Sequence, residues 1–319
     1  MELTADVARV DFGGCLLLDD AGRLIEATVR GRLMGPRKSL GNAVVVGDRA
    51  RAEIEGERTV VFDVEPRRNR FSRRAPGNRP VEQVVAANLD QVVLVASIVE
   101  PEFRSGLADR VLAQADHCGI AARIVLTKIE LDPRAEADRI LAAYARAGLP
   151  GHAVSAHTGA GLAELMTECA GRRSLFVGHS GVGKSTLLNA LIPGLDLLAG
   201  RVNEKTRKGR HTTSAAWLVR PEPGLTLIDT PGVRAFGLWG IDARNLAQGY
   251  PELRALLGGC RFADCRHGGE PGCAIRLGLD AGAIARERWD SFLKLRDELE
   301  REEAGETERV RATARYRRR

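Results

Sequence analysis

Aromatic residues and long apolar runs are both scarce in this sequence. Only 4% of the 319 residues are Phe, Trp or Tyr, so the core must be built mainly from Leu, Val, Ile and Ala. No apolar stretch approaches the length of a membrane-spanning helix, and no basic segment followed by an apolar stretch stands at the start. We therefore expect a cytoplasmic protein that makes no membrane contact.

The overall composition is typical of a soluble, folded protein. The hydrophobic content is 44% and the charged content 28%, and a chain of this length is expected to form two or three domains. The formal net charge is +6, and most of the positive charge is arginine, which suits bidentate contacts with phosphate. This balance favours a polyanionic partner, although an arginine-rich genome would give the same count.

Residues 178–185, GHSGVGKS, have the spacing of a phosphate-binding loop. They follow an apolar run at 174–177 and lead into a helical pattern at 186–191, so backbone N–H groups and a helix N-terminus can surround a phosphate. Lys184 is expected on the β- and γ-phosphates, and the Ser185 hydroxyl on Mg²⁺. The nucleotide-contacting residues predicted here are Gly178, His179, Ser180, Gly181, Val182, Gly183, Lys184, Ser185 and Thr186.

Residues 84–177 alternate between strand-like and helix-like segments. Apolar runs at 92–96, 123–126 and 153–154 are interleaved with helical patterns at 105–118, 133–146 and 162–169. This alternation predicts a parallel sheet with helices on both faces. The loops at the carboxyl ends of its strands should converge on one edge, where such folds bind their ligands.

Two of these loops resemble the guanine-reading motifs of GTPases. Thr127, Lys128 and Glu130 occupy the places of N-K-x-D, and Ser155 and Ala156 begin the second motif. A carboxylate at the end of the first motif accepts hydrogen bonds from N1–H and the 2-amino group of guanine, whereas adenine presents an acceptor at N1. The two loops favour GTP over ATP.

Two further segments resemble switch loops. The run at 225–228 leads into Asp229-Thr230-Pro231-Gly232, where Asp229 can hold Mg²⁺ through water and the Gly232 N–H can meet the γ-phosphate. Residues 209–213, GRHTT, have the character of a first switch loop, in which Thr213 would offer a hydroxyl to Mg²⁺.

A cysteine cluster follows near the C-terminal end. Cys260, Cys265, His267 and Cys273 supply three thiolates and one imidazole, the donor set of a closed tetrahedral Zn²⁺ site. Four protein ligands leave no open position, so the metal is expected to be structural.

Residues 1–75 are expected to be all-β. Short runs at 7–10, 15–18, 25–29 and 43–46 are separated by turns, which favours a small barrel of the OB-fold type. Two basic groups favour an RNA-facing surface, with a solvated linker as the alternative for the second. The groups are Arg30, Arg32, Arg37 and Lys38, and Arg67, Arg68, Arg70, Arg73, Arg74 and Arg79.

The C-terminal part is expected to be helical. Apolar periodicity predicts a helix over 283–303, and the basic run 309–319 is expected to be disordered alone and able to fold onto RNA. A basic surface is expected around the cysteine cluster, formed by Arg261, Arg266, His267, Arg276, Arg286 and Arg288.

The order of the motifs is that of a circularly permuted GTPase. The base-reading motifs at 127 and 155 precede the phosphate loop at 178, and the switches follow at about 212 and 229. Together with the barrel-like start and the cysteine cluster, this order resembles the RsgA (YjeQ) family of small-subunit-dependent GTPases over nearly the whole chain. The resemblance implies an OB-fold at 1–78, a circularly permuted GTPase domain at 79–238 and a zinc-binding helical domain with a basic tail at 239–319.

The same resemblance implies partners and a reaction. The chain would hydrolyse GTP during late maturation of the small (30S) ribosomal subunit, hold rRNA through its flanking domains and be released on hydrolysis. GTP and GDP, one structural Zn²⁺ and nucleotide-bound Mg²⁺ would be its ligands, and we expect a monomer.

Three residues depart from the usual GTPase pattern. Thr127 stands for Asn and Glu130 for Asp, and the longer Glu130 requires the loop to retract. Val233 stands where many GTPases carry a water-orienting Gln, so intrinsic hydrolysis should be slow unless another group orients the water. The resemblance implies that a switch histidine does so, and His211 fits that place, with an exposed loop residue as the alternative.

Two other functions are compatible with parts of this pattern. A permuted NTPase could act on another RNA or as a signalling switch without the ribosome. A nucleic-acid-binding scaffold with an inactive nucleotide site is disfavoured because Lys184, Ser185 and Asp229 are all present.

Overall fold

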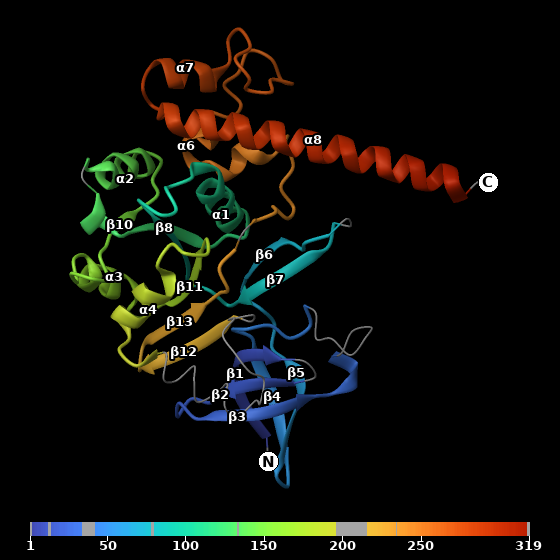
Figure 1. Ribbon diagram of the computed structural model, residues 1–319. Helices are drawn as coiled ribbons and strands as arrows, with labels where there is room; N and C mark the ends of the chain where they lie inside the picture. Colours follow the sequence, from blue (N-terminus) through green and yellow to red (C-terminus); the bar gives the residue numbers. More distant parts are fainter. Residues whose placement is uncertain are drawn as a thin grey trace.

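The computed structural model describes residues 2–11, 14–33, 42–77, 80–132, 134–195, 216–233 and 235–317. A five-stranded barrel, a mainly parallel sheet with helices and a helical C-terminal module follow one another along the chain (Figure 1). The predicted switch residues His211 and Thr213 lie outside the described residues. No helix among the described residues has both the length and the apolar character that crossing a bilayer requires.

The barrel confirms the expected all-β start. Its strands run in the order β1-β2-β3-β5-β4, and β1 pairs with β4 to close it. Aliphatic residues such as Ala5, Val7, Leu17 and Val61 alternate into its core. The strands are β1 (Glu2–Asp11), β2 (Gly14–Leu18), β3 (Leu24–Val29), β4 (Arg49–Glu55) and β5 (Arg58–Val64), with a 3₁₀ turn η1 (Gly31–Leu33) after β3.

The strand expected at 43–46 is absent, and this prediction was wrong. Residues 42–47 form turns, yet Val44, Val45 and Val46 are buried because each packs into a different hydrophobic cluster. Gly47 closes the segment with φ +89°, and a Cβ there would lie 2.3 Å from the Ala87 carbonyl oxygen. Burial in three separate hydrophobic clusters explains the apolar character of this run, so no strand is needed to account for it.

The parallel sheet is also as expected. Strands β10, β9, β8, β11 and β13 lie side by side in that order and run parallel, and β12 is antiparallel to β13. Alternate residues face opposite sides: Val92 and Leu94 pack with α1 and α2, whereas Val93 and Val95 pack with α3 and α4. The elements are β8 (Gln91–Ser97), α1 (Ser105–His117), β9 (Ala121–Thr127), η3 (Ile129–Leu131), α2 (Glu136–Arg146), β10 (Gly151–Ala153), α3 (Leu162–Cys169), β11 (Arg173–Gly178), α4 (Lys184–Leu191), β12 (Trp217–Glu222) and β13 (Leu225–Asp229).

The barrel is joined to this sheet by one strand pair and one buried carboxylate. Strand β1 pairs with β12 at Arg9 and Trp217, so the barrel and the sheet are continuous. Asp6 is 2% exposed and receives the guanidinium groups of Arg173, at 3.0 Å, and Arg220. A buried charge is tolerated only when it is paired in this way.

The hairpin of β6 (Arg70–Arg74) and β7 (Glu82–Ala87) lies between the barrel and the C-terminal module (Figure 1). Three arginines of the second basic group, in or just before this hairpin, pair with carboxylates: Arg67 with Asp48, Arg68 with Asp90 and Arg70 with Glu82. The side chains of Arg68 and Arg70 stay more than half exposed. These pairs offset the charge of half of the second basic group, which weakens the prediction of an RNA-facing surface there.

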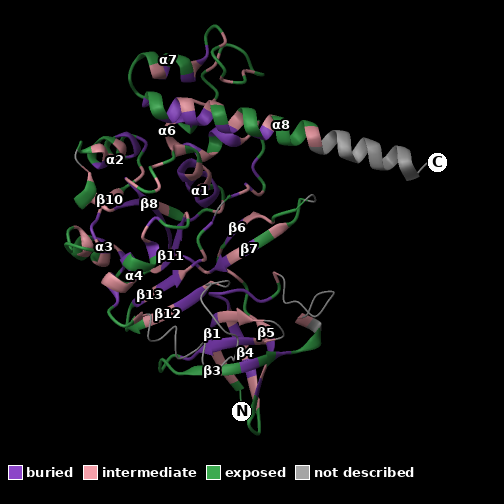
Figure 2. Ribbon diagram, in the orientation of Figure 1, coloured by how far each residue is buried: buried purple, intermediate pink, exposed green. Residues whose placement is uncertain are grey.

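The C-terminal module ends in the long helix α8 (Arg286–Arg317), whose N-terminal half packs over α1 (Figure 2). The helix does not begin at Ala283, because the Ala283 N–H donates to Gly278 and closes the preceding helix. It also continues through residues 309–317, which were expected to be disordered. The shorter elements are η4 (Leu246–Gly249), α6 (Pro251–Arg254) and α7 (Ala274–Asp280).

Arg288 on α8 anchors this module to the sheet domain. Its guanidinium is 3% exposed, pairs with Asp109 on α1 and donates to Glu252 at 2.7 Å. It also lies between the rings of Tyr144 and Tyr250, 4.8 and 4.5 Å from their centroids. Arg288 therefore belongs to the interior, and its assignment to a basic surface was wrong.

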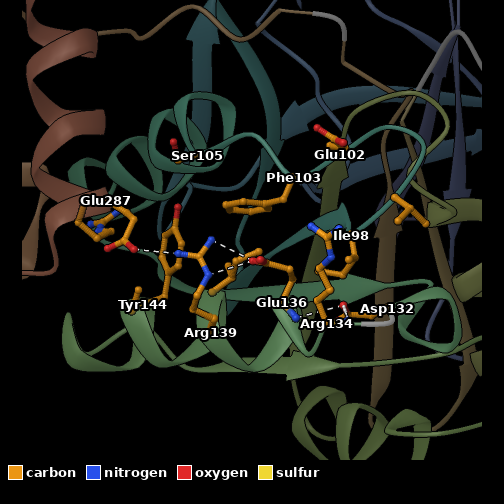
Figure 3. Close-up of a pocket in the computed structure, with 14 residues that line it drawn as sticks. Ile98, Glu102, Phe103, Ser105, Asp132, Arg134, Glu136, Arg139, Tyr144 and Glu287 are labelled. Atoms are coloured by element: carbon orange, nitrogen blue, oxygen red, sulfur yellow. Dashed lines mark hydrogen bonds and ion pairs between the residues drawn. The ribbon is translucent and has the colours of Figure 1, made fainter.

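A cavity of about 500 Å³ lies beside this anchor, between α2, the loop before α1 and the first turn of α8 (Figure 3). Arg139 of α2 points across it and pairs with Glu136 of the same helix and with Glu287 of α8. The cavity wall thus supplies a second, exposed link between the sheet domain and the module.

Candidate nucleotide site and metal centre

The predicted phosphate loop connects β11 to α4 and needs its glycines. Gly181 and Gly183 have φ values of +86° and +84°, a region that side chains disfavour. A Cβ at Gly178 would lie 2.4 Å from the Val95 carbonyl oxygen of the neighbouring strand. Ser185 and Thr186 are exposed on the first turn of α4, where their hydroxyls are accessible. His179 is half-buried, and its ring Nδ1 lies 2.7 Å from the Ser180 carbonyl oxygen.

Lys184 and Asp229 form an ion pair at the centre of this site. The Lys184 side chain is 7% exposed, and its ammonium group contacts the carboxylate of Asp229 at the end of β13. Burial raises the pKa of Asp229, and the charge of Lys184 opposes that shift. In this structure Lys184 thus has a carboxylate as its partner at the place where the phosphate was predicted.

The segment after Asp229 lies directly on the phosphate loop. The Thr230 hydroxyl donates to the Phe176 carbonyl at 2.7 Å, and the Val233 N–H donates to the Gly178 carbonyl at 2.9 Å. A Cβ at Gly232 would lie only 2.9 Å from the Ser180 Cα, so glycine is required there. The predicted second switch and the phosphate loop are thus in contact.

The predicted base-reading loop reaches the phosphate loop from the other side. Thr127 is 3% exposed, and its hydroxyl lies 2.5 Å from the Val182 carbonyl oxygen and 3.2 Å from that of Ala96. Lys128 has φ +63°, and its ammonium group donates to the carbonyl groups of Gly181 at 3.1 Å and Glu100 at 2.5 Å. Residues 127–128 therefore fix the distance between the two loops.

Glu130 is exposed in η3, beside the second base-reading motif. The Ser155 hydroxyl lowers the pKa of Glu130, burial opposes this, and the positive charge of Lys128 contributes to the lowering. Ser155 is fully buried and also accepts the Thr158 N–H at 3.0 Å. Asp132, the other carboxylate nearby, accepts the N–H groups at the start of α2, as its position before that helix predicts.

One wall of the site was not predicted from the sequence. The loop between β8 and α1 carries Glu100 and Pro101, whose atoms meet Lys128 and Gly181, and the Ser97 hydroxyl holds the Pro101 carbonyl at 2.6 Å. The signal was available, because this loop also leaves the carboxyl end of a parallel strand. The loop between β8 and α1 contains no sequence motif that would have identified it as part of a nucleotide site.

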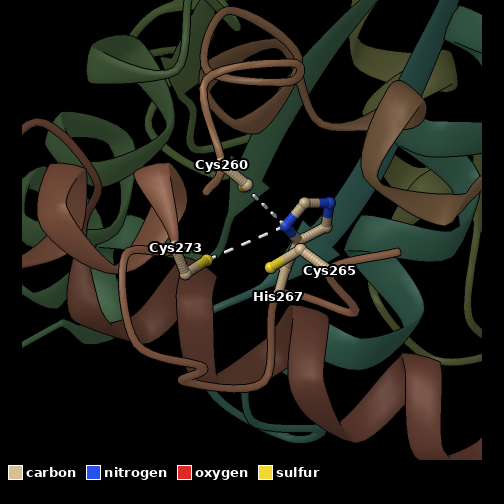
Figure 4. A group of neighbouring side chains, drawn as sticks. All are labelled: Cys260, Cys265, His267 and Cys273. Carbon is tan, nitrogen blue, oxygen red and sulfur yellow. Dashed lines mark hydrogen bonds between the residues drawn. The ribbon is translucent and has the colours of Figure 1, made fainter. Parts of the chain in front are cut away.

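The predicted zinc ligands come together in the C-terminal module (Figure 4). The donor atoms of Cys260, Cys265, His267 and Cys273 all lie within 4.8 Å of one another. The His267 Nδ1 is 3.5 Å from the Cys260 sulfur and 3.8 Å from the Cys273 sulfur. Three sulfurs and one imidazole in this arrangement fit a tetrahedral Zn²⁺, which would crosslink loop 260–267 to the start of α7.

A second layer of contacts shapes this metal centre. His267 adopts φ +59°, and the carboxylate of Glu270 accepts the N–H groups of Arg266, at 3.0 Å, and Gly268, at 2.8 Å, on either side of it. The Ala274 N–H also donates to the Cys260 sulfur at 3.4 Å. Partners of this kind orient metal ligands.

Comparison with known proteins matches this architecture to one family. The family model described as RsgA GTPase matches residues 64–239. A protein of Gemmatimonas aurantiaca named small ribosomal subunit biogenesis GTPase RsgA is 44% identical over 283 residues, which cover 88% of this chain and 92% of the relative. A protein of the same name from Bacteroides fragilis is 35% identical over 88% of this chain and 92% of its own length.

Solved structures agree in fold. The crystal structure of YjeQ from Thermotoga maritima is 27% identical with a TM-score of 0.73, over 94% of this chain and 99% of that one. The structure of YloQ, described as a circularly permuted GTPase, is 24% identical with a TM-score of 0.69, over 94% of this chain and 96% of its own. The barrel, the permuted order of the loops and the extent of these matches agree, and the chain belongs to the RsgA GTPase family.

Proposed function

We propose that this chain is a GTP hydrolase that assists late maturation of the small ribosomal subunit. The observation that carries the proposal is the contact of Thr127 and Lys128 with Val182 and Gly181, which makes one nucleotide site from two loops in permuted order. The names of the relatives support the ribosomal role.

The site residues have separate roles in this proposal. The phosphate loop and Lys184 hold the phosphates, Glu130 and Ala156 read guanine, and the Gly232 N–H senses the γ-phosphate. Ser185, Asp229 and Thr213 would hold Mg²⁺, whose charge neutralises the phosphate oxygens. Zn²⁺ on the four-residue cluster has a structural role only.

Hydrolysis is proposed to be slow until the ribosome completes the site. Val233 is 8% exposed and apolar, so it cannot orient the attacking water. His211 is the residue proposed to do so, in a segment outside the described residues. We place the division into domains at 1–78, 79–238 and 239–319, and we propose a cytoplasmic monomer that binds rRNA through the first and last of these and leaves on hydrolysis.

The test is a GTP hydrolysis assay with purified small subunits, with large subunits and with neither. Small subunits alone should raise the turnover by about a hundredfold, the scale of a positioned acid–base group. Equal stimulation by naked RNA or by large subunits would favour an NTPase of another RNA, and no stimulation at all would favour a switch without the ribosome.

A further inference from the structure

The turn between two of the zinc ligands presents an aromatic ring to solvent. Residues 261–264 are all exposed, and the side chain of Phe262 is 46% exposed, although the chain has few aromatic residues. Single exposed apolar residues are common on protein surfaces, so exposure alone carries no conclusion. The surroundings of this ring distinguish it.

The turn is anchored at both ends. Cys260 and Cys265 belong to the metal cluster, the Cys265 N–H donates to the Phe262 carbonyl at 3.3 Å, and the Arg261 N–H donates to the Gly272 carbonyl at 3.0 Å. A Cβ at Gly272 would lie 2.8 Å from the Arg261 Cβ, so the two strands of the loop lie in close contact. The backbone that carries the ring therefore has little conformational freedom left to lose on binding.

The charge beside the ring is the second observation. Arg266 pairs with Glu300 and Arg276 with Asp280, so neither guanidinium is available to a phosphate without breaking an ion pair. Arg261, by contrast, has no ion pair with any carboxylate of the residues described here. Its guanidinium lies 5.5 Å from the centroid of the Phe262 ring, so the cation and the π-face are adjacent.

We propose that Arg261 and Phe262 form a platform on which one unpaired base of rRNA stacks while the guanidinium binds the adjoining phosphate. Exposed aromatic rings and arginine planes are the means by which proteins bind splayed-out bases of RNA, and such stacking tolerates any base. The proposal rests on the proposed ribosomal function and deepens it by naming one contact. A ribosomal protein that captures Phe262 in an apolar pocket is the competing partner.

The test measures the affinity of full-length, zinc-loaded variants for purified small subunits and for a fluorescent single-stranded RNA 10-mer. Phe262→Ala should weaken binding by about tenfold, Phe262→Trp should bind as the parent does, and Phe262→Leu should behave like Ala. Retained binding in Phe262→Leu would indicate an apolar pocket and overturn the stacking proposal.

Variants of Arg261 test the proposed phosphate contact independently of the ring. Arg261→Ala should reduce the dependence of log affinity on log salt concentration by about one unit of slope, whereas Arg261→Lys should keep it. Leu277→Ala is the matched control, since Leu277 is an exposed apolar residue of the neighbouring helix α7. An equal loss in this control would show a general apolar patch and refute the platform.

The outcome separates this inference from the function on which it rests. If the parent protein does not bind small subunits, the proposed function fails. If the parent binds and Phe262→Ala, with an unchanged zinc content, binds equally well, only the platform is refuted.

Discussion

The Thr127 hydroxyl lies 2.5 Å from the Val182 carbonyl oxygen, so the base-reading loop and the phosphate loop are joined by a direct, buried hydrogen bond. A hydroxyl has a single proton, and Val182 receives it here at a shorter distance than Ala96 offers. Thr127, which replaces the usual Asn, thus positions the loop. The Glu130 carboxylate is then the group of this motif that is available to recognise the base.

The first prediction is that Thr127→Val weakens GDP and IDP binding equally, by about tenfold. The variant keeps the shape of the side chain but leaves the buried Val182 carbonyl without this donor, a loss of about 1–3 kcal/mol. Isothermal titration with both nucleotides measures the effect. Thr127→Ser keeps the hydroxyl and serves as the control, and a loss confined to GDP would show that Thr127 acts on the 2-amino group of guanine, which IDP lacks.

The second prediction concerns Glu130. Glu130→Gln should weaken GDP binding by about a hundredfold, because a charged acceptor of two guanine hydrogen bonds is lost, and it should leave the weak ATP affinity unchanged. Titrations with mantGTP and mantATP measure the discrimination. Glu130→Asp should retain it, and equal affinities of the parent for the two nucleotides would remove the guanine assignment.

The pH dependence of this site follows from the same carboxylate. The Ser155 hydroxyl lowers the pKa of Glu130 from its ordinary value of 4.5, so the side chain stays ionised between pH 7 and pH 5. A lowered pKa means that the charge, and the contribution of Glu130 to GDP binding, is lost only as the pH falls through that lowered value. The ratio of the GDP affinities of the parent and Glu130→Gln, in which titration of the GDP phosphate cancels, should therefore be constant over this range. In a Ser155→Ala background the decline of this ratio should begin at a higher pH.

The third prediction concerns His211 and the rate of hydrolysis. His211→Ala should lower subunit-stimulated kcat by about a hundredfold and leave GTP binding nearly unchanged, because a group that orients water acts in the transition state and not in binding. Single-turnover hydrolysis with small subunits, beside a mantGTP titration, separates the two effects. His157→Ala, in the exposed part of the second base motif, is the control; unchanged stimulated kcat in His211→Ala would exclude this residue.

The fourth prediction is that one Zn²⁺ per chain is bound and that the C-terminal module depends on it. Cys265→Ser should reduce the zinc content to well below one and lower the melting temperature of the protein, because the metal replaces a hydrophobic core in loop 260–273. Elemental analysis and calorimetry measure both. Cys118→Ser changes a half-buried cysteine outside the cluster and should alter neither, whereas normal zinc content in Cys265→Ser would contradict the ligand assignment.

The nucleotide loops and the zinc cluster could be predicted because their chemistry requires particular residues at fixed spacing. The parallel sheet followed from apolar runs such as 92–96 that alternate with helical patterns, because this alternation is typical of strands buried on both faces. The run at 43–46 failed because its three valines enter three separate cores, which local patterning does not encode. The loop at Glu100 was missed because it contributes backbone carbonyls, for which any residue serves.

Arginines were the least predictable residues, because charge in a sequence does not say where the partner lies. Arg67, Arg68 and Arg70 find carboxylates 12 to 22 positions away, at Asp48, Asp90 and Glu82. Arg288 finds Asp109 at 179 positions. Only the folded chain brings these partners together, so a basic cluster in sequence overstated the basic surface.

The last prediction tests Arg288 as the anchor of the C-terminal module. Arg288→Met should destabilise the protein by about 3–5 kcal/mol, because Asp109 and Glu252 would remain buried without a cation. Arg288→Lys should recover only part of this, since one ammonium group cannot reach two carboxylates and also lie between two rings. Arg286→Met, which breaks an exposed pair with Asp290 on the same helix, should cost less than about 1 kcal/mol.

The loss in free energy of unfolding caused by Arg288→Met should also depend on pH. Burial raises the pKa of Asp109, and the Arg288 charge opposes that shift, so the pKa rises further in the variant. A carboxyl with a raised pKa favours the folded state at low pH and loses that contribution as the pH rises through it. Urea unfolding should therefore show a smaller deficit at pH 5 than at pH 8. Equal deficits for the Arg288 and Arg286 variants would mean that the buried pair does not hold α8 against α1.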